Sequence, residues 1–195
     1  MSVDLTWEGP LGPGAFPEDD PLLFERLCEA GVYLRVKIYD GGRIVAYAGQ
    51  SVSLLARFDQ HLCAMLSLAA PLRDSSGRVA FSGDAGARIR AYDNIREAVA
   101  LAAEDAARVR FWYALCDDRF HREHLNLVEG LLQRRLAKRI AEVENAKAAP
   151  GTVPEDVPDV WRNDLSGLDG AGRSLLRGLL GDEPMTRDLL AGYAA

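Results

Sequence analysis

The sequence is poor in lysine and cysteine and has no long apolar run. Its 23 basic residues are 20 arginines and three lysines. Arginine suits bidentate phosphate contacts, but we attribute most of the excess to a GC-rich coding bias. Cys28, Cys63 and Cys116 are an odd number without metal-ligand spacing, and we interpret them as buried free thiols. No stretch approaches the roughly 20 apolar residues of a membrane span, and no basic segment followed by an apolar one begins the chain. We therefore expect a cytoplasmic protein with no membrane partner.

Charge is unevenly distributed along the 195 residues, whose net charge is −6. Residues 26–149 hold 19 basic and 15 acidic side chains, whereas residues 1–25 hold six acids and no base. Residues 150–195 hold four bases and eight acids. A mildly basic centre between acidic ends is compatible with a phosphate-bearing ligand, although it is a weak electrostatic footprint for a nucleic-acid-binding protein.

Residues 31–48 predict a tight β-hairpin. Apolar and polar side chains alternate over residues 32–39, which is the pattern of a half-buried strand. Residues 40–42 (Asp-Gly-Gly) supply the turn, because glycine accepts a positive φ without steric cost. A second strand is expected over residues 43–48.

The length of this turn predicts the register of the two strands. If the loop takes three residues, Tyr39 faces Arg43 and Arg35 faces Tyr47. Tyr33 then lies diagonally from Tyr47 on the same face of the sheet. A slip of one residue would separate the two tyrosines, so the register is a strong prediction.

A helix is expected to follow Gly49, with Ser51 or Ser53 as its N-cap. Its apolar stripe is expected to contain Leu55, Phe58, Leu62, Leu66 and Ala69, with Leu54 and Met65 at the edge. Arg57 and His61 are four residues apart and should project together from one border of that stripe. Hairpin and helix thus present two phenols, a guanidinium and an imidazole, which can contact a phosphate and move a proton.

These residues resemble the signature of the GIY-YIG nuclease superfamily, whose members include the incision subunit of nucleotide-excision repair, intron-homing endonucleases and some restriction enzymes. The matching elements are Gly31-Val32-Tyr33, Tyr47-Ala48-Gly49, and Arg57 with His61. The superfamily also requires a glutamate on a later helix, after a third strand, and Glu129 is similar to that motif. The resemblance covers roughly residues 29–146. Four elements in the right order are more specific than any triplet alone.

The resemblance implies an α/β (α+β) fold in which a three-stranded, mainly antiparallel sheet, made of the hairpin and one later strand, is flanked by helices. It implies a metal-dependent endonuclease with the catalytic residues Tyr33, Tyr47, Arg57, His61 and Glu129. A single Mg²⁺ or Mn²⁺ on Glu129 would polarise the scissile phosphate of DNA, and a water near the tyrosines would attack in line. Arg57 would neutralise phosphoryl charge, and His61 would bond the phosphate or relay a proton.

Glu129 also stands out without the resemblance. In a helix expected over residues 122–146 it falls about 40° from Leu125, inside the apolar stripe. A carboxylate facing the core needs a metal or an arginine partner, and the alternative is a glutamate at the stripe edge that reaches water. His121 and His124 could bind a metal together, but without a carboxylate at matching spacing a surface pair is favoured.

The sequence departs from the family pattern at three positions. Val32 and Ala48 replace the two isoleucines for which the family is named. Gln50 stands where several members carry a lysine, which removes one charge that could lower a tyrosine pKa.

The remaining chain divides into parts by composition. We expect an irregular N-terminal arm and short helix (1–28), a nuclease-like domain (29–149), a proline-rich linker (150–158) and a short helical C-terminal extension (159–195). Within the domain we expect a loop-rich insertion (70–92), a helix (95–107) and a third strand (109–115). The candidate contacts to nucleic acid are Arg35, Lys37, Arg78, Arg88, Arg90 and Asn145.

Two other functions stay open at this stage. The same fold could hold nucleic acid, DNA or RNA, without cutting it. More remotely, the hairpin and helix could be structural and the acidic ends could recruit a protein partner. A double-strand cut requires two active sites, so a homodimer is an attractive arrangement.

Overall fold

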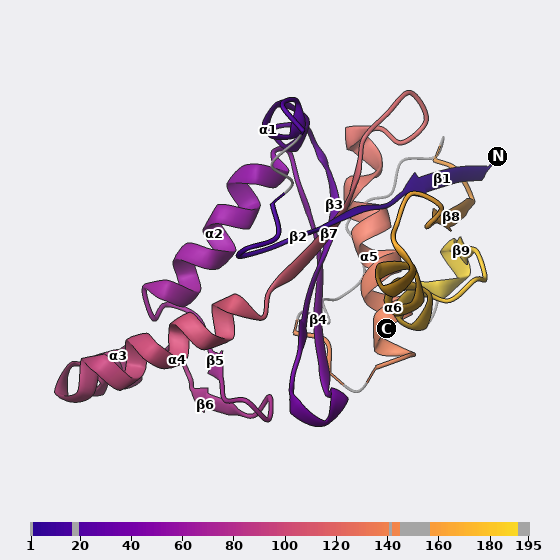
Figure 1. The fold of residues 1–195 in the computed structure, drawn as a ribbon. Helices are drawn as coiled ribbons and strands as arrows, with labels where there is room; N and C mark the ends of the chain where they lie inside the picture. Colours follow the sequence, from indigo (N-terminus) through magenta and orange to yellow (C-terminus); the bar gives the residue numbers. More distant parts are fainter. Residues whose placement is uncertain (1, 17–19, 141, 145–156, 191–195) are drawn as a thin grey trace.

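The computed structural model describes residues 2–16, 20–140, 142–144 and 157–190 (Figure 1). Its strands are β1 (Ser2–Thr6), β2 (Glu8–Leu11), β3 (Gly31–Ile38), β4 (Ile44–Ser51), β5 (Leu72–Arg73), β6 (Val79–Phe81), β7 (Arg110–Leu115), β8 (Val160–Asp164) and β9 (Met185–Thr186). Its α-helices are α1 (Leu23–Leu27), α2 (Leu54–Leu66), α3 (Ala85–Ala91), α4 (Ile95–Ala107), α5 (Leu125–Ala137) and α6 (Gly170–Leu180). Short 3-10 turns lie at Asp40–Gly42, Tyr92–Asn94, Arg122–His124 and Arg187–Leu189.

The central sheet has four strands in the order β2-β7-β3-β4, and each neighbouring pair is antiparallel. β3 and β4 form the predicted hairpin, with Arg35 opposite Tyr47. Tyr39 N donates to the carbonyl of Arg43 at 2.9 Å across the loop. The predicted register is therefore confirmed. The expectation of three strands is wrong, because β2 adds a fourth strand beside the predicted third one, β7.

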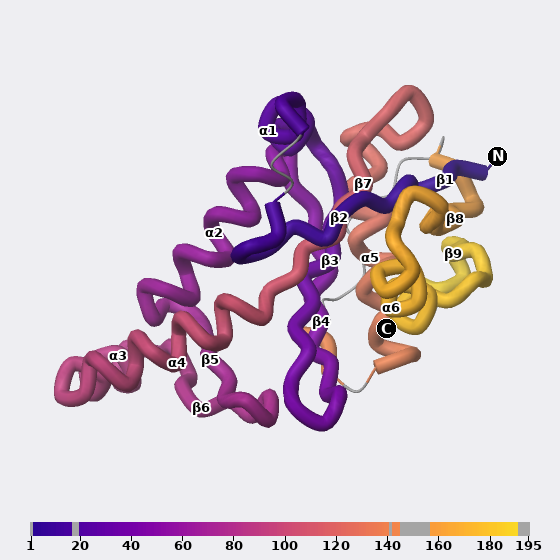
Figure 2. The backbone as a smooth tube through the Cα atoms, in the orientation of Figure 1, coloured from indigo at the N-terminus to yellow at the C-terminus, as the bar shows by residue number. Residues whose placement is uncertain are grey.

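The N-terminal arm is not wholly irregular, because it contains the strands β1 and β2. β1 pairs in parallel with β8, so that Ser2 lies opposite Val160, and β8 pairs with β9 in antiparallel fashion. Figure 2 shows this pairing, in which the indigo start of the chain runs beside the orange segment of β8. The C-terminal segment contains α6, as expected of a helical extension, but it also supplies two strands. Residues from both ends of the chain thus form one sheet.

Side chains of β3 alternate between two apolar cores. Val32, Leu34 and Val36 belong to a core that also contains residues of α5, of α6 and of the second sheet, which is made of β1, β8 and β9. Tyr33 lies in the other core with Phe58 of α2 and residues of α4. Figure 1 shows α2 and α4 on one side of the central strands and α5 and α6 on the other. β3 is therefore covered on both faces, whereas its alternating pattern predicted a half-buried strand.

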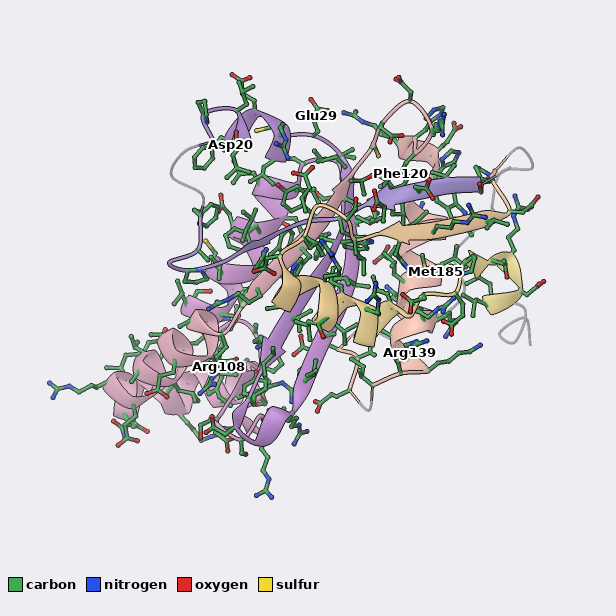
Figure 3. The ribbon with its side chains drawn as sticks, turned by 45° about the vertical axis from the view of Figure 1, so that its right-hand side comes forward. Asp20, Glu29, Arg108, Phe120, Arg139 and Met185 are labelled. Carbon is green, nitrogen blue, oxygen red and sulfur yellow. The ribbon has the colours of Figure 1, made fainter. Side chains whose placement is uncertain are left out.

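The second sheet closes the core that faces α5. Phe120 and Met185, both labelled in Figure 3, are buried on this side of the molecule. Phe120 meets the ring of Trp161 edge-on, with centroids 5.8 Å apart. Trp7 is fully buried, and its Nε1 donates to Asn163 Oδ1 at 2.9 Å. The aromatic residues near both chain ends therefore serve to join the two sheets.

α2 begins where the sequence predicts. Ser53 is its N-cap, and its hydroxyl accepts a hydrogen bond from Ala56 N at 3.4 Å. The buried face is rotated from the expected stripe, because Leu54 and Met65 are buried whereas Leu66 is 52% exposed. The rotation follows from docking on the aromatic face of β3, which helix periodicity alone does not encode.

Two later helices differ in how well the sequence predicts them. α4 has the expected bounds, residues 95–107, and α5 is shorter than the expected 122–146. α5 follows a 3-10 turn and ends at Ala137, after which residues 142–144 run along β4 instead of continuing the helix. Asn145 lies outside the described residues.

Two further expectations need correction. The insertion at residues 70–92 is less loop-rich than expected, since it holds the β5-β6 pair and α3, which Asp84 caps by accepting from Ala87 N at 2.9 Å. Cys28 and Cys63 are exposed free thiols rather than buried ones. Cys116 is half-buried, and burial raises the pKa of its thiol to about 11.

Candidate active site

The register of the hairpin brings the two motif tyrosines into contact. Tyr33 on β3 and Tyr47 on β4 stack with ring centroids 5.9 Å apart and planes 13° from parallel. Tyr33 is fully buried, and Tyr47 is half-buried. The diagonal pair predicted from the turn length is therefore present, and only the Tyr47 side of it reaches solvent.

His61 of α2 lies against both tyrosines. Its ring centroid is 5.5 Å from that of Tyr33 and 5.1 Å from that of Tyr47, both edge-on. Arg35 Nη1 lies 2.8 Å from His61 Nδ1, and Tyr33 Oη lies 2.8 Å from His61 Nε2. Because a guanidinium can only donate, Nδ1 accepts, and the neutral imidazole carries its proton on Nε2. His61 therefore donates to Tyr33 Oη.

Burial and positive charge keep this cluster in a defined protonation state. Burial, followed by the charges of Arg35, Arg57 and Lys37, lowers the pKa of His61 to about 3. Burial and the neighbouring Tyr47 raise the pKa of Tyr33 well above its ordinary value. Near neutral pH the imidazole is thus uncharged and the Tyr33 phenol is protonated.

Arg57 borders this cluster from α2, as its spacing from His61 predicts. Its guanidinium is half-buried, and Nη1 donates to Gln60 Oε1 at 3.1 Å. Its charge lowers the pKa of both Tyr33 and His61. On Tyr33 this effect opposes burial and the neighbouring Tyr47, which raise the pKa, whereas on His61 it acts in the same direction as burial. Four predicted residues, Tyr33, Tyr47, Arg57 and His61, therefore gather on one face of the sheet.

Steric contacts explain the two motif glycines. A Cβ at Gly49 would lie 2.4 Å from Tyr33 Oη, and a Cβ at Gly31 would lie 2.4 Å from the carbonyl oxygen of Ala114 on β7. Neither contact is tolerable for a real side chain. Gly49 thus leaves room for the Tyr33 ring, and Gly31 lets β7 approach β3.

Glu129 comes to the sheet from the other side. It lies on α5, which packs on the face opposite Tyr33, and its side chain is half-buried rather than turned into the core. Gln133 Nε2 donates to Glu129 Oε1 at 3.1 Å and lies 3.4 Å from the carbonyl oxygen of Ala48. The carboxylate therefore lies near the outer edge of β4, the strand that carries Tyr47, and an amide is one of its partners.

The residues proposed to contact nucleic acid are in different environments. Arg78, Arg88 and Arg90 are exposed. Lys37 is only 2% exposed, and its Nζ bonds Asp105 Oδ2 at 2.8 Å, so in this conformation its ammonium group is already paired. Arg35 is directed into the tyrosine cluster, where its guanidinium lies 5.0 Å from the Tyr47 ring centroid.

Sequence reasoning missed a pocket beside the cluster. Its volume is about 520 Å³, and its lining includes Tyr47, Arg35, Arg73 and Glu144. Arg73 and Glu144 carry no local signal, because neither follows a motif or a periodic pattern. Only the folded chain brings them to the tyrosines.

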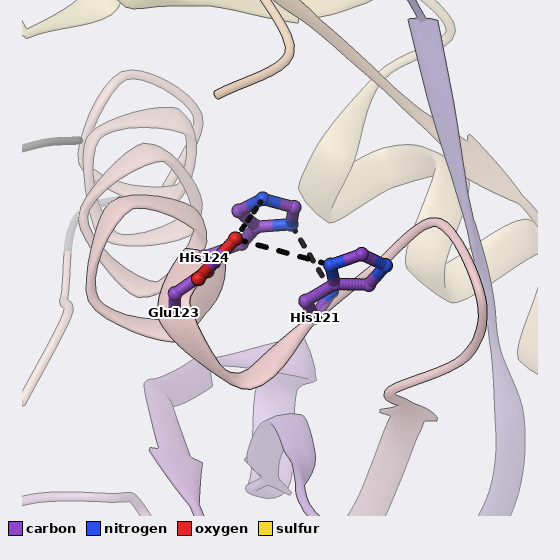
Figure 4. Close-up of side chains that lie close together, drawn as sticks. All are labelled: His121, Glu123 and His124. Atoms are coloured by element: carbon purple, nitrogen blue, oxygen red, sulfur yellow. Dashed lines mark hydrogen bonds and ion pairs between the residues drawn. The ribbon is translucent and has the colours of Figure 1, made fainter. Parts of the chain in front are cut away.

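A separate cluster contains His121, Glu123 and His124 (Figure 4). Glu123 Oε1 lies 3.8 Å from His121 Nδ1 and 3.7 Å from His124 Nε2. His124 Nδ1 accepts from the backbone N of His121 at 3.1 Å, so its neutral ring carries the proton on Nε2, the atom that faces Glu123. The Nε2 of His121 bonds the carbonyl of Asp118 at 2.8 Å. These bonds fix the start of α5 and leave a poor set of metal ligands.

Comparisons with protein-family models, with curated protein sequences and with solved structures find no match to this chain. Within residues 2–16, 20–140, 142–144 and 157–190, no helix is long and apolar enough to cross a membrane.

Proposed function

We propose that the chain is a metal-dependent endonuclease that hydrolyses phosphodiester bonds in DNA, as its resemblance to the GIY-YIG nuclease superfamily implies. One observation carries the proposal. Tyr33 and Tyr47 come from two separate motifs and His61 from a helix, yet the three rings meet, and Arg35 hydrogen-bonds the imidazole. A cationic, aromatic cluster of this kind suits a phosphate and an attacking water.

The two tyrosines differ in their suitability for contact with substrate. Tyr47 is half-buried and lines the pocket, so its hydroxyl is the group proposed to orient the attacking water and take its proton. Tyr33 is fully buried and its pKa is raised, which disfavours its phenolate. We assign Tyr33 as a positioning residue that holds His61.

Arg57 and His61 have complementary proposed roles. Arg57 carries a guanidinium group and is partly exposed, so it can neutralise charge that develops on the phosphoryl oxygens. His61 is neutral and donates from Nε2 to Tyr33, which fixes the ring beside Tyr47. Its role is to hold the cluster in place as an imidazole that stays uncharged near neutral pH.

The oxygen atoms around Glu129 are of the type that a hard divalent cation binds. The carboxylate lies near the carbonyl of Ala48 and the amide of Gln133, and oxygen ligands of this type are those that Mg²⁺ and Mn²⁺ take. Glu129 would hold the ion, which when bound would polarise the phosphate. Gln133 keeps the carboxylate oriented toward the edge of β4.

A nucleic-acid-binding module without cleavage is the second candidate. The observation in its favour is that Tyr33 is inaccessible and that Glu144 contacts Arg35, so the described conformation presents little free cationic surface to a scissile phosphate. A cytoplasmic location and a homodimer, which would supply the two sites of a double-strand cut, belong to the endonuclease proposal.

Supercoiled-plasmid cleavage with Mg²⁺ or Mn²⁺ tests the proposal. Wild type should nick or linearise the plasmid, and Glu129→Gln should abolish this while leaving the melting temperature near that of wild type. Glu123→Gln, at an exposed glutamate in the 3-10 turn that precedes α5, is the matched control and should cleave normally. Salt-sensitive DNA binding without metal-dependent nicking would favour the binding module. If the protein shows no DNA binding and no nicking, both candidates are overturned.

A further inference from the structure

The segment Glu142-Val143-Glu144 lies along the outer edge of β4. Ala46 N donates to the carbonyl of Glu142 at 3.3 Å, and Glu144 N donates to the carbonyl of Ala46 at 2.9 Å. This is a single parallel bridge between Ala46 and Val143, not a regular strand. Because an extended chain alternates its side chains, Glu142 and Glu144 project to the same side.

Both carboxylates are bonded to arginines, two of which line the pocket. Glu144 forms an ion pair with Arg35 and accepts from Arg73 Nε at 3.4 Å. Glu142 lies 2.6 Å from Arg73 Nη2 and also pairs with Arg43. The side chains of Arg35 and Arg73 are only 10% and 7% exposed. Two acidic side chains thus neutralise a largely buried cationic surface.

Arg35 connects this acidic segment to the tyrosine cluster. Its guanidinium bonds His61, lies over the ring of Tyr47 and pairs with Glu144. Its Nε is buried and has no hydrogen-bond partner among the described residues. The donor set of Arg35 is therefore incompletely satisfied when Glu144 is the anion, and a ligand with more acceptor oxygens could use it.

Phosphodiester groups match this surface better than two carboxylates do. The two glutamates are two residues apart on an extended chain, which separates them by about 6.6 Å along the strand. The phosphates of an extended single strand likewise follow one another along a line. Arginine binds phosphate through its planar fork of donors.

We propose that the pocket of Arg35, Arg73 and Tyr47 binds the backbone phosphates of a single nucleic-acid strand, and that Glu142 and Glu144 pair with its two arginines in the free protein. The proposal rests on the proposed function and adds a regulated step to it. Removal of Glu144 alone would leave a buried, unpaired guanidinium, which is costly. Exchange of the carboxylates for phosphates avoids that cost, so the segment competes with nucleic acid and leaves when the strand binds.

A charge-matched binding experiment tests the competition. The double variant Glu142→Gln/Glu144→Gln should bind a fluorescent ten-nucleotide oligothymidylate about tenfold more tightly than wild type, without metal. A gain of this size is expected if the free pocket is open about a tenth of the time. The control variant Glu25→Gln/Glu104→Gln removes the same charge at two exposed glutamates on α1 and α4 and should change affinity less than about threefold. Equal gains in both variants would overturn the proposal.

Hydrogen exchange of the wild-type chain provides a test that needs no variant. The amides of Ala46 and Glu144 donate the two bonds of the bridge, so both should exchange faster when oligothymidylate saturates the protein. Unchanged or slower exchange at both amides would show that the segment stays in place and would also overturn the proposal.

The outcome is separable from that of the nuclease proposal. A tenfold gain in binding without plasmid nicking would support the phosphate pocket and reject the nuclease. Metal-dependent nicking by wild type, with the same oligothymidylate affinity for wild type and Glu142→Gln/Glu144→Gln, would support the nuclease and reject the phosphate pocket.

Discussion

Lys37 and Asp105 form a buried ion pair, with Nζ of the lysine 2.8 Å from Oδ2 of the aspartate. Two more groups converge on the same carboxylate, since Tyr39 Oη donates to Oδ1 at 2.6 Å and Arg73 N donates to Oδ2 at 3.2 Å. Asp105 is fully buried. One carboxylate of α4 therefore ties together β3, the end of the hairpin and the segment that carries Arg73.

Removal of Asp105 should be far more damaging than loss of its negative charge alone suggests. Asp105→Ala removes the carboxylate that bonds the buried Lys37 ammonium, and we expect a loss of about 3–5 kcal/mol in the free energy of unfolding by urea. Adding Lys37→Met should restore part of that stability. Asp182→Ala, which breaks the exposed pair with Arg177, should cost less than about 1 kcal/mol. Similar losses for Asp105→Ala and Asp182→Ala would contradict the role assigned to the buried pair.

Gly49 should be required for its small size. Gly49→Ala places a methyl group 2.4 Å from Tyr33 Oη, so the Tyr33 ring must move away from His61. We expect a loss of about 1–3 kcal/mol in unfolding free energy from overpacking. Gly178→Ala is the control, because a Cβ there has no atom within 4 Å and alanine favours the helix, here α6. An equally stable Gly49→Ala protein would show that the cluster is loosely packed.

Stability should depend on pH through His61. The folded pKa of about 3 is below the ordinary value of 6.5, so the unfolded chain binds a proton that the folded chain does not. Stability is therefore full above pH 6.5 and falls as pH drops toward 3, by at most about 1.4 kcal/mol per pH unit. Urea unfolding between pH 7 and 4.5 should show a smaller decrease in His61→Gln than in wild type.

The two tyrosines should differ in a cleavage assay. Under the endonuclease proposal, Tyr47→Phe should lower the cleavage rate by about 10²-fold or more, with oligonucleotide affinity unchanged, because it removes the group at the attacking water. Tyr33→Phe should have the smaller effect on rate, together with a measurable loss of stability as the His61 bond disappears. A larger rate effect for Tyr33→Phe would reverse the two assignments.

Local patterns in the sequence predict the hairpin and its register well. The three-residue turn and the alternation along β3 specify which residues face each other, so the contact of Tyr33 with Tyr47 follows from residues close in the chain. The bounds of α4 and the position of β7 are also local properties. His61 joins the cluster because it is one turn from Arg57 on a helix that directly follows the hairpin.

Other parts depend on partners that are distant in sequence. β2 pairs with β7 near Phe111, and β1 pairs with β8 near Val160, so the partner of each strand cannot be predicted from the strand itself. The alternation of Val3, Leu5 and Trp7 is a strand signal that the nearby prolines and glycines obscured. Glu144 meets Arg35 through a turn after α5 that helix periodicity does not predict, since the pattern continues beyond Ala137.

The parallel pairing of β1 with β8 constrains the order in which the chain can fold. β1 must wait for β8, which follows far along the chain, whereas β3, β4 and β7 can pair soon after they emerge. Contacts that are distant in sequence form slowly, because a long loop must close first. During that interval Val3, Leu5 and Trp7 have no strand to cover them, so a chain interrupted before residue 160 would expose an apolar edge to other chains.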